Sequence, residues 1–321
     1  MNISDKMKTV LITGGTGLVG SRLTEMLISK GYRVLWLSRE RNLHADIPTY
    51  RWDYRNNEID NEALEQADVI IHLAGSNLGE GRWSDEKKRE IVESRVRTAE
   101  LLLERLKLIG RIPGTFISAS ATGYYGPGVN ERIFTEEDVL SESDFLSTTC
   151  RKWEDAAFSF NELPGIRTVI LRTGFILSRD SEAFKKMVLP MRLGVGSPLG
   201  SGRQYLSWIH LDDICRLYIS AIEDSTLQGV YNTVAPEYIT NAGFMRTLAK
   251  VMKKPFFFPA VPAFVLRLVM GEAADMVLSG SRISSQKIRD AGYRFQYDTA
   301  EKAITASLRA EGNQERGKAK M

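Results

Sequence analysis

The sequence predicts an α/β fold in which helices cover both faces of a doubly wound parallel sheet, followed by a smaller α+β region. Three observations support this prediction. Short apolar runs typical of buried strands recur along the first half of the 321-residue chain. Segments with apolar residues at helical spacing separate these runs. After about residue 176 the alternation becomes irregular, which indicates a different kind of structure in the remainder.

The predicted elements follow one another in a regular order. A first helix starts at Leu18 and ends at Gly31. Ser84 is expected to cap a long helix that carries one apolar face as far as Leu106. Residues 185–193 are expected to be helical, and 256–296 are expected to form a small helical and β addition. The predicted strands are residues 9–13, 33–37, 68–73, 115–119, 168–172 and 229–234.

Composition argues against several classes of function. Lys and Arg number 43 against 40 Asp and Glu, and this net charge of +3 is too small to predict a nucleic-acid or membrane partner. The only two cysteines, Cys150 and Cys215, cannot form a disulfide framework, which indicates a reduced, cytoplasmic setting. The three histidines lack metal-ligand spacing, so no metal is expected. No signal peptide or membrane span is evident either.

A glycine-rich segment, TGGTGLVG at residues 13–20, follows the first strand and opens the first helix. Glycines at this spacing allow a tight turn, close approach of a pyrophosphate, and close packing of helix on strand. The helix N-terminus then faces the phosphates. A kinase-like phosphate loop is excluded, because Ser21 and Arg22 follow in place of Lys-Ser/Thr. The residues expected to hold a dinucleotide here are Gly14, Thr16, Gly17, Leu18, Val19 and Gly20.

The end of the second strand indicates which dinucleotide binds. Enzymes that use NAD usually carry Asp or Glu there for the ribose 2′-hydroxyl. This chain has Ser38 and Arg39, whose hydroxyl and guanidinium suit a 2′-phosphate, and we therefore predict NADP. NAD stays open as the alternative, because Glu40 could bind the ribose hydroxyl instead. Arg39 could also be a solvated surface charge with no role in binding.

Several further motifs carry a family resemblance. They are HLAG (72–75), GYYG (123–126), LRTG (171–174), GSGRQ (200–204), SWIH (207–210) and TVAP (233–236). Together with the glycine-rich segment they resemble the extended short-chain dehydrogenases/reductases, and within them the atypical epimerase-like subgroup also labelled cell-division-inhibitor-like. The stretch from Pro255 to Phe295 resembles that subgroup's C-terminal domain of unknown function. The resemblance extends from Thr9 to about Ala303.

The resemblance implies a Rossmann domain that binds NADP and a smaller region that closes over the nicotinamide end. It implies that Asp53 lies near the adenine. Other roles are open for some of the cofactor-side residues: Leu73 and Ile176 could be core residues, and Glu90 and Arg95 could form a pair on the helix surface. The further cofactor-side residues that it implies are Leu73, Ala74, Gly75, Glu90, Arg95 and Ile176.

The parent class uses a Tyr-x-x-x-Lys pair for acid–base chemistry, and no tyrosine of this chain has a lysine four residues later. If Glu154 matches the glutamate that often follows the pair, Leu146 and Cys150 stand at its two positions. This departure puts the standard dehydrogenase mechanism in doubt, whereas it leaves cofactor binding untouched. Cys150 is then either a reactive thiol or a small buried residue.

Other residues could transfer protons. Ser120 matches the class's catalytic Ser/Thr best, with Ser118 as the weaker choice. Tyr124 and Tyr125 follow the same strand, and either phenol is a candidate acid; structural packing is the alternative for both. His210 could act on a substrate or orient the chain by hydrogen bonding.

These motifs divide the chain unequally. The NADP-binding Rossmann domain is predicted to span 1–175 and to be completed by 205–234. Residues 176–204 and 235–310 are expected to form a substrate-side cap without a core of its own, and 311–321 a flexible tail.

Three functions remain open on the sequence alone. The first is an NADP-dependent oxidoreductase or epimerase-like enzyme for an unidentified small molecule. The second is a non-catalytic NADP(H)-binding redox regulator, and the third is a nucleotide-sugar epimerase. We expect a monomer or a homodimer.

Overall fold

A central sheet of eight strands organises the computed structural model, which describes residues 7–79, 81–129, 131–139 and 144–318. The strand order is β11-β8-β6-β5-β1-β2-β3-β4, and every neighbouring pair is parallel except β3 with β4. The order reverses between β1 and β5, which opens a crevice at the carboxyl ends of these strands. The predicted doubly wound fold is therefore confirmed. The strands are β1 (Thr9–Thr13), β2 (Arg33–Ser38), β3 (Thr49–Asp53), β4 (Glu58–Ile59), β5 (Val69–His72), β6 (Thr115–Ala121), β8 (Arg167–Thr173) and β11 (Gly229–Thr233).

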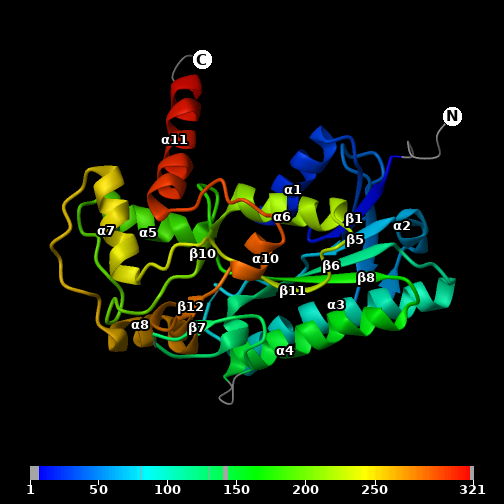
Figure 1. Ribbon diagram of the computed structural model, residues 1–321, viewed down its shortest axis with the longest axis horizontal. Coiled ribbons are helices and arrows are strands. Elements are labelled where there is room, and N and C mark those ends of the chain that lie inside the picture. Colours follow the sequence, from blue (N-terminus) through cyan, green and yellow to red (C-terminus); the bar gives the residue numbers. More distant parts are fainter. Residues whose placement is uncertain (1–6, 80, 130, 140–143, 319–321) are drawn as a thin grey trace.

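Helices cover both faces of this sheet (Figure 1). One hydrophobic cluster joins the sheet to α1 and α6, with Leu23 and Tyr218 buried in it. The other joins it to α2, α3 and α4, with Leu102 and Phe160 buried in it. Burial on both faces explains why the strands read as continuous apolar runs. The helices concerned are α1 (Leu18–Ser29), α2 (Asn61–Gln66), α3 (Asp85–Ile109), α4 (Phe145–Phe158) and α6 (Leu211–Glu223).

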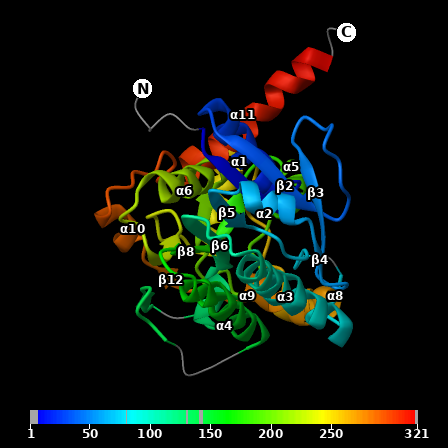
Figure 2. The same cartoon turned by 90° about the vertical axis from the view of Figure 1, so that its right-hand side faces the viewer.

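The remaining segments form a cap at the carboxyl edge of the sheet (Figures 1 and 2). Its buried core includes Phe184, Trp208 and Phe244, so the expectation of a cap without its own core is wrong. Contacts between α5 and α7 and between α7 and α11 enclose enough apolar surface to exclude water from this cluster. The cap elements are β9 (Phe175–Leu177), α5 (Glu182–Arg192), β10 (Trp208–His210), α7 (Asn241–Met252), α8 (Ala263–Met270), α9 (Asp275–Leu278), α10 (Gln286–Asp290) and α11 (Ala300–Lys318).

Shorter elements complete the chain. Strands β7 (Ile133–Phe134) and β12 (Arg282–Ile283) pair in parallel, and β9 pairs with β10. The 3-10 turns are η1 (Thr122–Tyr125), η2 (Ser159–Glu162) and η3 (Gly271–Ala274). Within the described residues, no helix has both the length and the apolar character needed to cross a membrane.

Two local features differ from the sequence prediction. Strand β3 turns back into β4 through Asn57, which has a positive φ of 59°, and the hairpin gives an antiparallel edge that the periodicity did not indicate. At the other end of the chain, α11 continues to Lys318, where a flexible tail was predicted from residue 311. Residues 319–321 lie outside the described residues.

Candidate functional site

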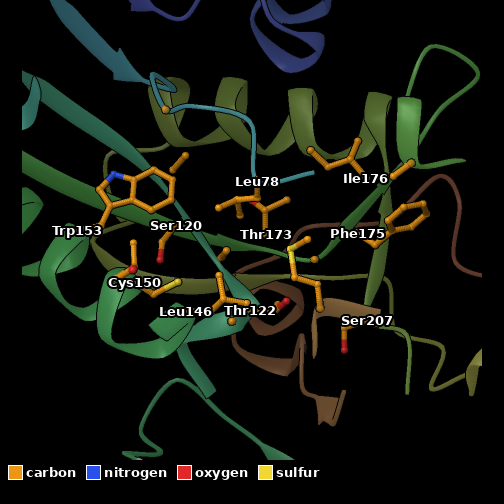
Figure 3. Close-up of a pocket in the computed structure, with 18 of the residues that line it drawn as sticks. Leu78, Ser120, Thr122, Leu146, Cys150, Trp153, Thr173, Phe175, Ile176 and Ser207 are labelled. Atoms are coloured by element: carbon orange, nitrogen blue, oxygen red, sulfur yellow. The ribbon is translucent and has the colours of Figure 1, made fainter. Parts of the chain in front are cut away.

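A cavity of about 680 Å³ lies where the strand order reverses, between the sheet and the cap. The loops that follow β1, β5, β6 and β8 form its inner wall, and α4, α9 and the cap strands close it. Figure 3 shows Ser120, Cys150 and Trp153 toward one end, and Phe175 and Ser207 toward the other. In open α/β sheets such a crevice is the usual place for a ligand.

The glycine-rich segment forms one wall of the cavity. Gly14 has a φ of +71°, and a Cβ there would lie 3.1 Å from the backbone of Leu73 and Ala74, where the loops after β1 and β5 meet. At Gly20 a Cβ would lie 2.3 Å from the carbonyl oxygen of Gly14, so only glycine lets α1 start so close to β1. Gly17 is the N-cap of α1 and provides no capping side chain, which leaves backbone N–H groups of the first turn free for a ligand.

All but one of the residues predicted in this segment line the cavity. Gly14, Gly17, Leu18, Val19 and Gly20 line the cavity, whereas Thr16 is exposed and lies outside its wall.

Ser38 and Arg39 lie at the carboxyl end of β2, beside β1, but outside the cavity wall. Arg39 is exposed. Asp53 also lies outside the wall. Its carboxylate accepts hydrogen bonds from the backbone N–H of Arg55 (2.9 Å) and from Nδ2 of Asn56 (2.8 Å). These bonds, the one from Arg55 foremost, lower the pKa of Asp53. Asp53 thus stabilises its own turn, and its implied position near the adenine stays a prediction.

The second wall follows β5. Leu73, Gly75 and Ile176 line the cavity, and so does Arg95 of α3, which is only 8% exposed. The guanidinium of Arg95 donates to the carbonyl oxygens of Ile91 (2.9 Å) and Ser76 (3.0 Å) and lies against Gly75. Burial lowers the pKa of Arg95.

Two other residues implied on this side do not reach the cavity. The carboxylate of Glu90 pairs with Lys87 of the same helix at 3.2 Å. Glu90 thus belongs to a pair on the helix surface, but its partner is Lys87 and not Arg95, the partner that the sequence suggested. The backbone N–H of Ala74 donates to the hydroxyl of Thr13, and the side chain of Ala74 packs against the hydrophobic cluster on one face of the sheet.

A buried chain of polar groups leads away from Ser120, which lines the cavity at the end of β6. The Ser120 hydroxyl donates to a carboxylate oxygen of Glu154 on α4 at 2.6 Å. Arg172 on β8 clamps both oxygens of that carboxylate with two bonds of 2.8 Å, and the pair is only 3% and 4% exposed. Burial by itself would lower the pKa of Arg172. The hydrogen bonds to Glu154 and the charge of Glu154 outweigh this effect, so the pKa of Arg172 is raised above its ordinary value. Because the Ser120 hydroxyl donates its hydrogen bond to Glu154, the lone pairs of that hydroxyl are left for a molecule in the cavity.

Leu146 and Cys150 both line the cavity beside Ser120 (Figure 3). Their position agrees with the match to the missing tyrosine and lysine. Burial, reinforced by the charge of Glu154, raises the pKa of the Cys150 thiol to about 12. The thiolate is therefore scarce at neutral pH, which favours the reading of Cys150 as a small buried residue.

Neither tyrosine is placed to give a proton to a molecule in the cavity. The ring of Tyr124 stacks on the guanidinium of Arg172 at 3.3 Å and does not line the wall. Tyr125 touches the cavity, but its hydroxyl donates to Oδ1 of Asn232 (2.7 Å) and accepts from Arg172 (3.0 Å). Burial raises the pKa of Tyr125 to about 12. The proton role predicted for these phenols thus has no geometric support, and packing explains both.

Two histidines also have structural partners. Nδ1 of His210 accepts from the backbone N–H of Asp212 at 3.1 Å and so caps α6. Nδ1 of His72 bonds the Thr13 hydroxyl at 2.9 Å in the sheet core. No group of residues suited to a metal is present in the described part of the chain.

Sequence reasoning missed the roles of several residues in the cavity wall and directly behind it. Arg172 could have been noticed, because it directly follows the apolar run at residues 169–171 in a buried strand, and a buried charge needs a partner. Glu154 lies one helical turn after Cys150 and so shares its helix face. No sequence signal indicates Phe175, Tyr205 or Met276, which reach the cavity only through the packing of the cap.

Comparison with known proteins gives two family matches. Residues 10–233 match the model of the NAD dependent epimerase/dehydratase family. Residues 261–307 match a domain of unknown function, DUF1731.

Similar whole proteins cover nearly all of the chain. Epimerase family protein SDR39U1 of Mus musculus is 34% identical over 92% of this chain and 98% of its own length. Epimerase family protein YfhF of Bacillus subtilis is 35% identical, with 92% and 96% covered. The human SDR39U1 structure with NADPH has a TM-score of 0.82 at 30% identity, with 93% and 98% covered. A nucleoside-diphosphate sugar epimerase from Corynebacterium glutamicum has a TM-score of 0.75 at 31% identity and is covered over 58% of its length.

Proposed function

The chain belongs to the NAD dependent epimerase/dehydratase family, and from this premise we propose that it is an NADP(H)-binding, epimerase-like oxidoreductase. Its substrate is a small molecule bound beside the nicotinamide end of the cofactor. The observation that carries the proposal is the shared cavity: the open N-terminus of α1 and the hydroxyl of Ser120 face the same space.

The residues present fit a dinucleotide phosphate. The cradle at Gly14 and Gly20 has no room for side chains, and the N-cap Gly17 leaves the helix amides open toward a pyrophosphate. Arg39, exposed beyond β2, is suited to a 2′-phosphate. Binding of NADPH by human SDR39U1 supports the same choice. When bound, the cofactor supplies or accepts the hydride.

Ser120 is the residue of this chain that meets the reacting oxygen of the substrate. Its lone pairs accept a hydrogen bond from a substrate hydroxyl, while Glu154 and Arg172 fix its orientation. Trp153 and Leu146 exclude water from that end of the cavity.

Titration with NADPH and NADH, followed by tryptophan fluorescence, tests the cofactor assignment. We expect Arg39→Ala to weaken NADPH binding about tenfold to a hundredfold, because a charge-assisted contact with the 2′-phosphate is lost, and to leave NADH binding unchanged. Arg41→Ala is the matched control, since Arg41 instead pairs with Asp60 (3.4 Å) and Glu62 (3.0 Å). Absence of saturable NADPH binding to the wild-type protein would contradict the proposal, and equal affinity for both cofactors would contradict the NADP preference.

The apolar residues in place of the catalytic pair favour a second candidate, a non-catalytic NADP(H)-binding redox regulator. Leu146 offers no acid, and the thiol of Cys150 stays protonated. This candidate predicts NADPH binding without oxidation of the cofactor by any carbonyl compound. Substrate-dependent turnover that Ser120→Ala abolishes would eliminate it.

A further inference from the structure

The charges around the cavity are unevenly placed. Three charged side chains line it within the described residues: Arg95, Asp144 and Asp275. Arg95 lies against Gly75, on the wall that faces the cofactor. The two aspartates belong to α4 and α9, which close the opposite, cap side of the cavity.

We call that side the outer pocket. Its residues come from the loop after β5, from η1, α4, β9, the loop before β10, and α9. They are Leu78, Thr122, Leu146, Phe175, Ser207 and Met276, and Figure 3 shows five of them around one space. Besides Asp144 and Asp275, this surface consists mainly of apolar side chains and hydroxyls, and no lysine or arginine contributes to it among the described residues.

The two aspartates offer nothing to an anion. Asp144 is the N-cap of α4, and its carboxylate accepts from the backbone N–H of Ser147 at 2.8 Å, so a negative charge already occupies the helix end that could have bound a phosphate. Asp275 lies 3.4 Å from the guanidinium of Arg267 and neutralises it.

A nucleoside diphosphate carries negative charge on both phosphates. Moving such a group from water into a cavity without cations is strongly unfavourable, and no described residue of the outer pocket carries a positive charge to offset this cost. An uncharged molecule carries no such penalty, and it gains from contact with Leu146, Phe175 and Met276.

From this distribution of charge we infer that the substrate is a small, uncharged and largely apolar alcohol, and not a nucleotide sugar. Its hydroxyl donates to Ser120, whose own proton is committed to Glu154. Its carbon skeleton fills the outer pocket. The inference rests on the proposed function, because it assumes that the glycine-rich wall holds the cofactor.

A matched pair of probes tests it. The compounds 1-phenylethanol and mandelate share a ring and a hydroxyl, and they differ in that a carboxylate replaces a methyl group. Binding of each to the NADP-saturated protein is measured by ligand-observed NMR titration, with UDP and UDP-glucose as further probes. We expect 1-phenylethanol to bind about tenfold more tightly than mandelate, and UDP and UDP-glucose not to bind.

A charge placed in the outer pocket should invert this preference. Met276→Arg adds a cation of similar length, and we expect it to weaken binding of 1-phenylethanol and to permit binding of mandelate. Met276→Gln, uncharged and of similar size, and Leu108→Arg, at a position 74% exposed on α3, should both keep the wild-type order.

Two results with the wild-type protein would overturn the inference, whatever the variants do. They are saturable binding of UDP or UDP-glucose, or affinity for mandelate that equals or exceeds that for 1-phenylethanol. Failure of the underlying function is recognised separately, because the protein would then not bind NADPH in the cofactor titration.

Discussion

At the scale of single residues, the molecule is most unusual around Glu154. A carboxylate and a guanidinium are both buried below 5% exposure behind a wall of the cavity, whereas most other ion pairs of the described residues lie at the surface. Such a pair is costly to desolvate, and it remains stable only because each group satisfies the other. Glu154 completes the arrangement by accepting from Ser120, so one carboxylate links the stability of the fold to the geometry of the site.

Glu154→Gln should therefore destabilise the protein by about 3–5 kcal/mol, because it leaves the cation of Arg172 buried without an opposite charge. Glu162→Gln is the control: its carboxylate pairs with Lys107 at 2.5 Å but is 61% exposed, and its loss should cost less than about 1 kcal/mol. Urea unfolding of the two variants measures both values. Equal losses would show that the buried pair contributes no more than an exposed one.

At the scale of elements, the start of α1 decides whether the site exists. Gly20 lies in the first turn of the helix, where there is no room for a Cβ beside the carbonyl oxygen of Gly14. This contact brings the helix axis close to β1 and directs the free amides of its first turn toward the cavity. The helix–strand packing and the phosphate site are therefore two consequences of one close approach.

Gly20→Ala should separate these elements, since the added Cβ would lie 2.3 Å from the Gly14 oxygen and 2.7 Å from the Gly15 Cα. We expect a loss of about 1–3 kcal/mol in the free energy of unfolding, and weaker NADPH binding. Gly114→Ala is the matched control, because a Cβ there meets its nearest atom, the Asp68 oxygen, at 3.7 Å. Calorimetry and cofactor titration give the two readings, and a variant with wild-type values in both would refute the argument.

At the scale of the whole molecule, the cap is fixed to the Rossmann sheet through α6. The carboxylate of Asp213 is fully buried and accepts from the backbone N–H groups of Gln296 and Tyr297, both at 2.9 Å. The ring of Tyr297 lies 3.8 Å from the ring of His210, which caps the same helix. These contacts hold the C-terminal segment over the edge of the sheet that bears the cavity.

Stability should fall as the pH drops below neutrality, because burial lowers the pKa of both His72 and His210 to about 4. In the unfolded chain a histidine takes up its proton near pH 6.5, so between pH 6.5 and 4 the unfolded state binds more protons and gains in relative stability. We expect each histidine to reduce the free energy of unfolding by about 2 kcal/mol between pH 7 and pH 5.

Urea unfolding at the two pH values measures this effect. The variants His72→Gln and His210→Gln should each lose part of the pH dependence, whereas His44→Gln, at an exposed position, should keep it. A free energy of unfolding that is constant from pH 7 to pH 5 would contradict the expectation.

The sequence by itself determined the parts that depend on local order. Apolar runs and helical spacing gave the parallel sheet and its helices, and the glycine spacing gave the turn between β1 and α1, because each of these is encoded within a few consecutive residues. The absence of Tyr-x-x-x-Lys could likewise be seen directly.

Only the tertiary structure decided which side chains meet. Ser120, Glu154 and Arg172 come from β6, α4 and β8, and their contact depends on strand order and on the packing of α4 against the sheet. The same packing turns the hydroxyl of Tyr125 toward Asn232, and among the residues that the structure describes it brings no lysine or arginine to the outer pocket. Which side chains can donate a proton, and which ligand charge the cavity accepts, depend on residues far apart in the sequence. The reason is that burial and hydrogen-bond partners, and not residue type alone, set the protonation of each group.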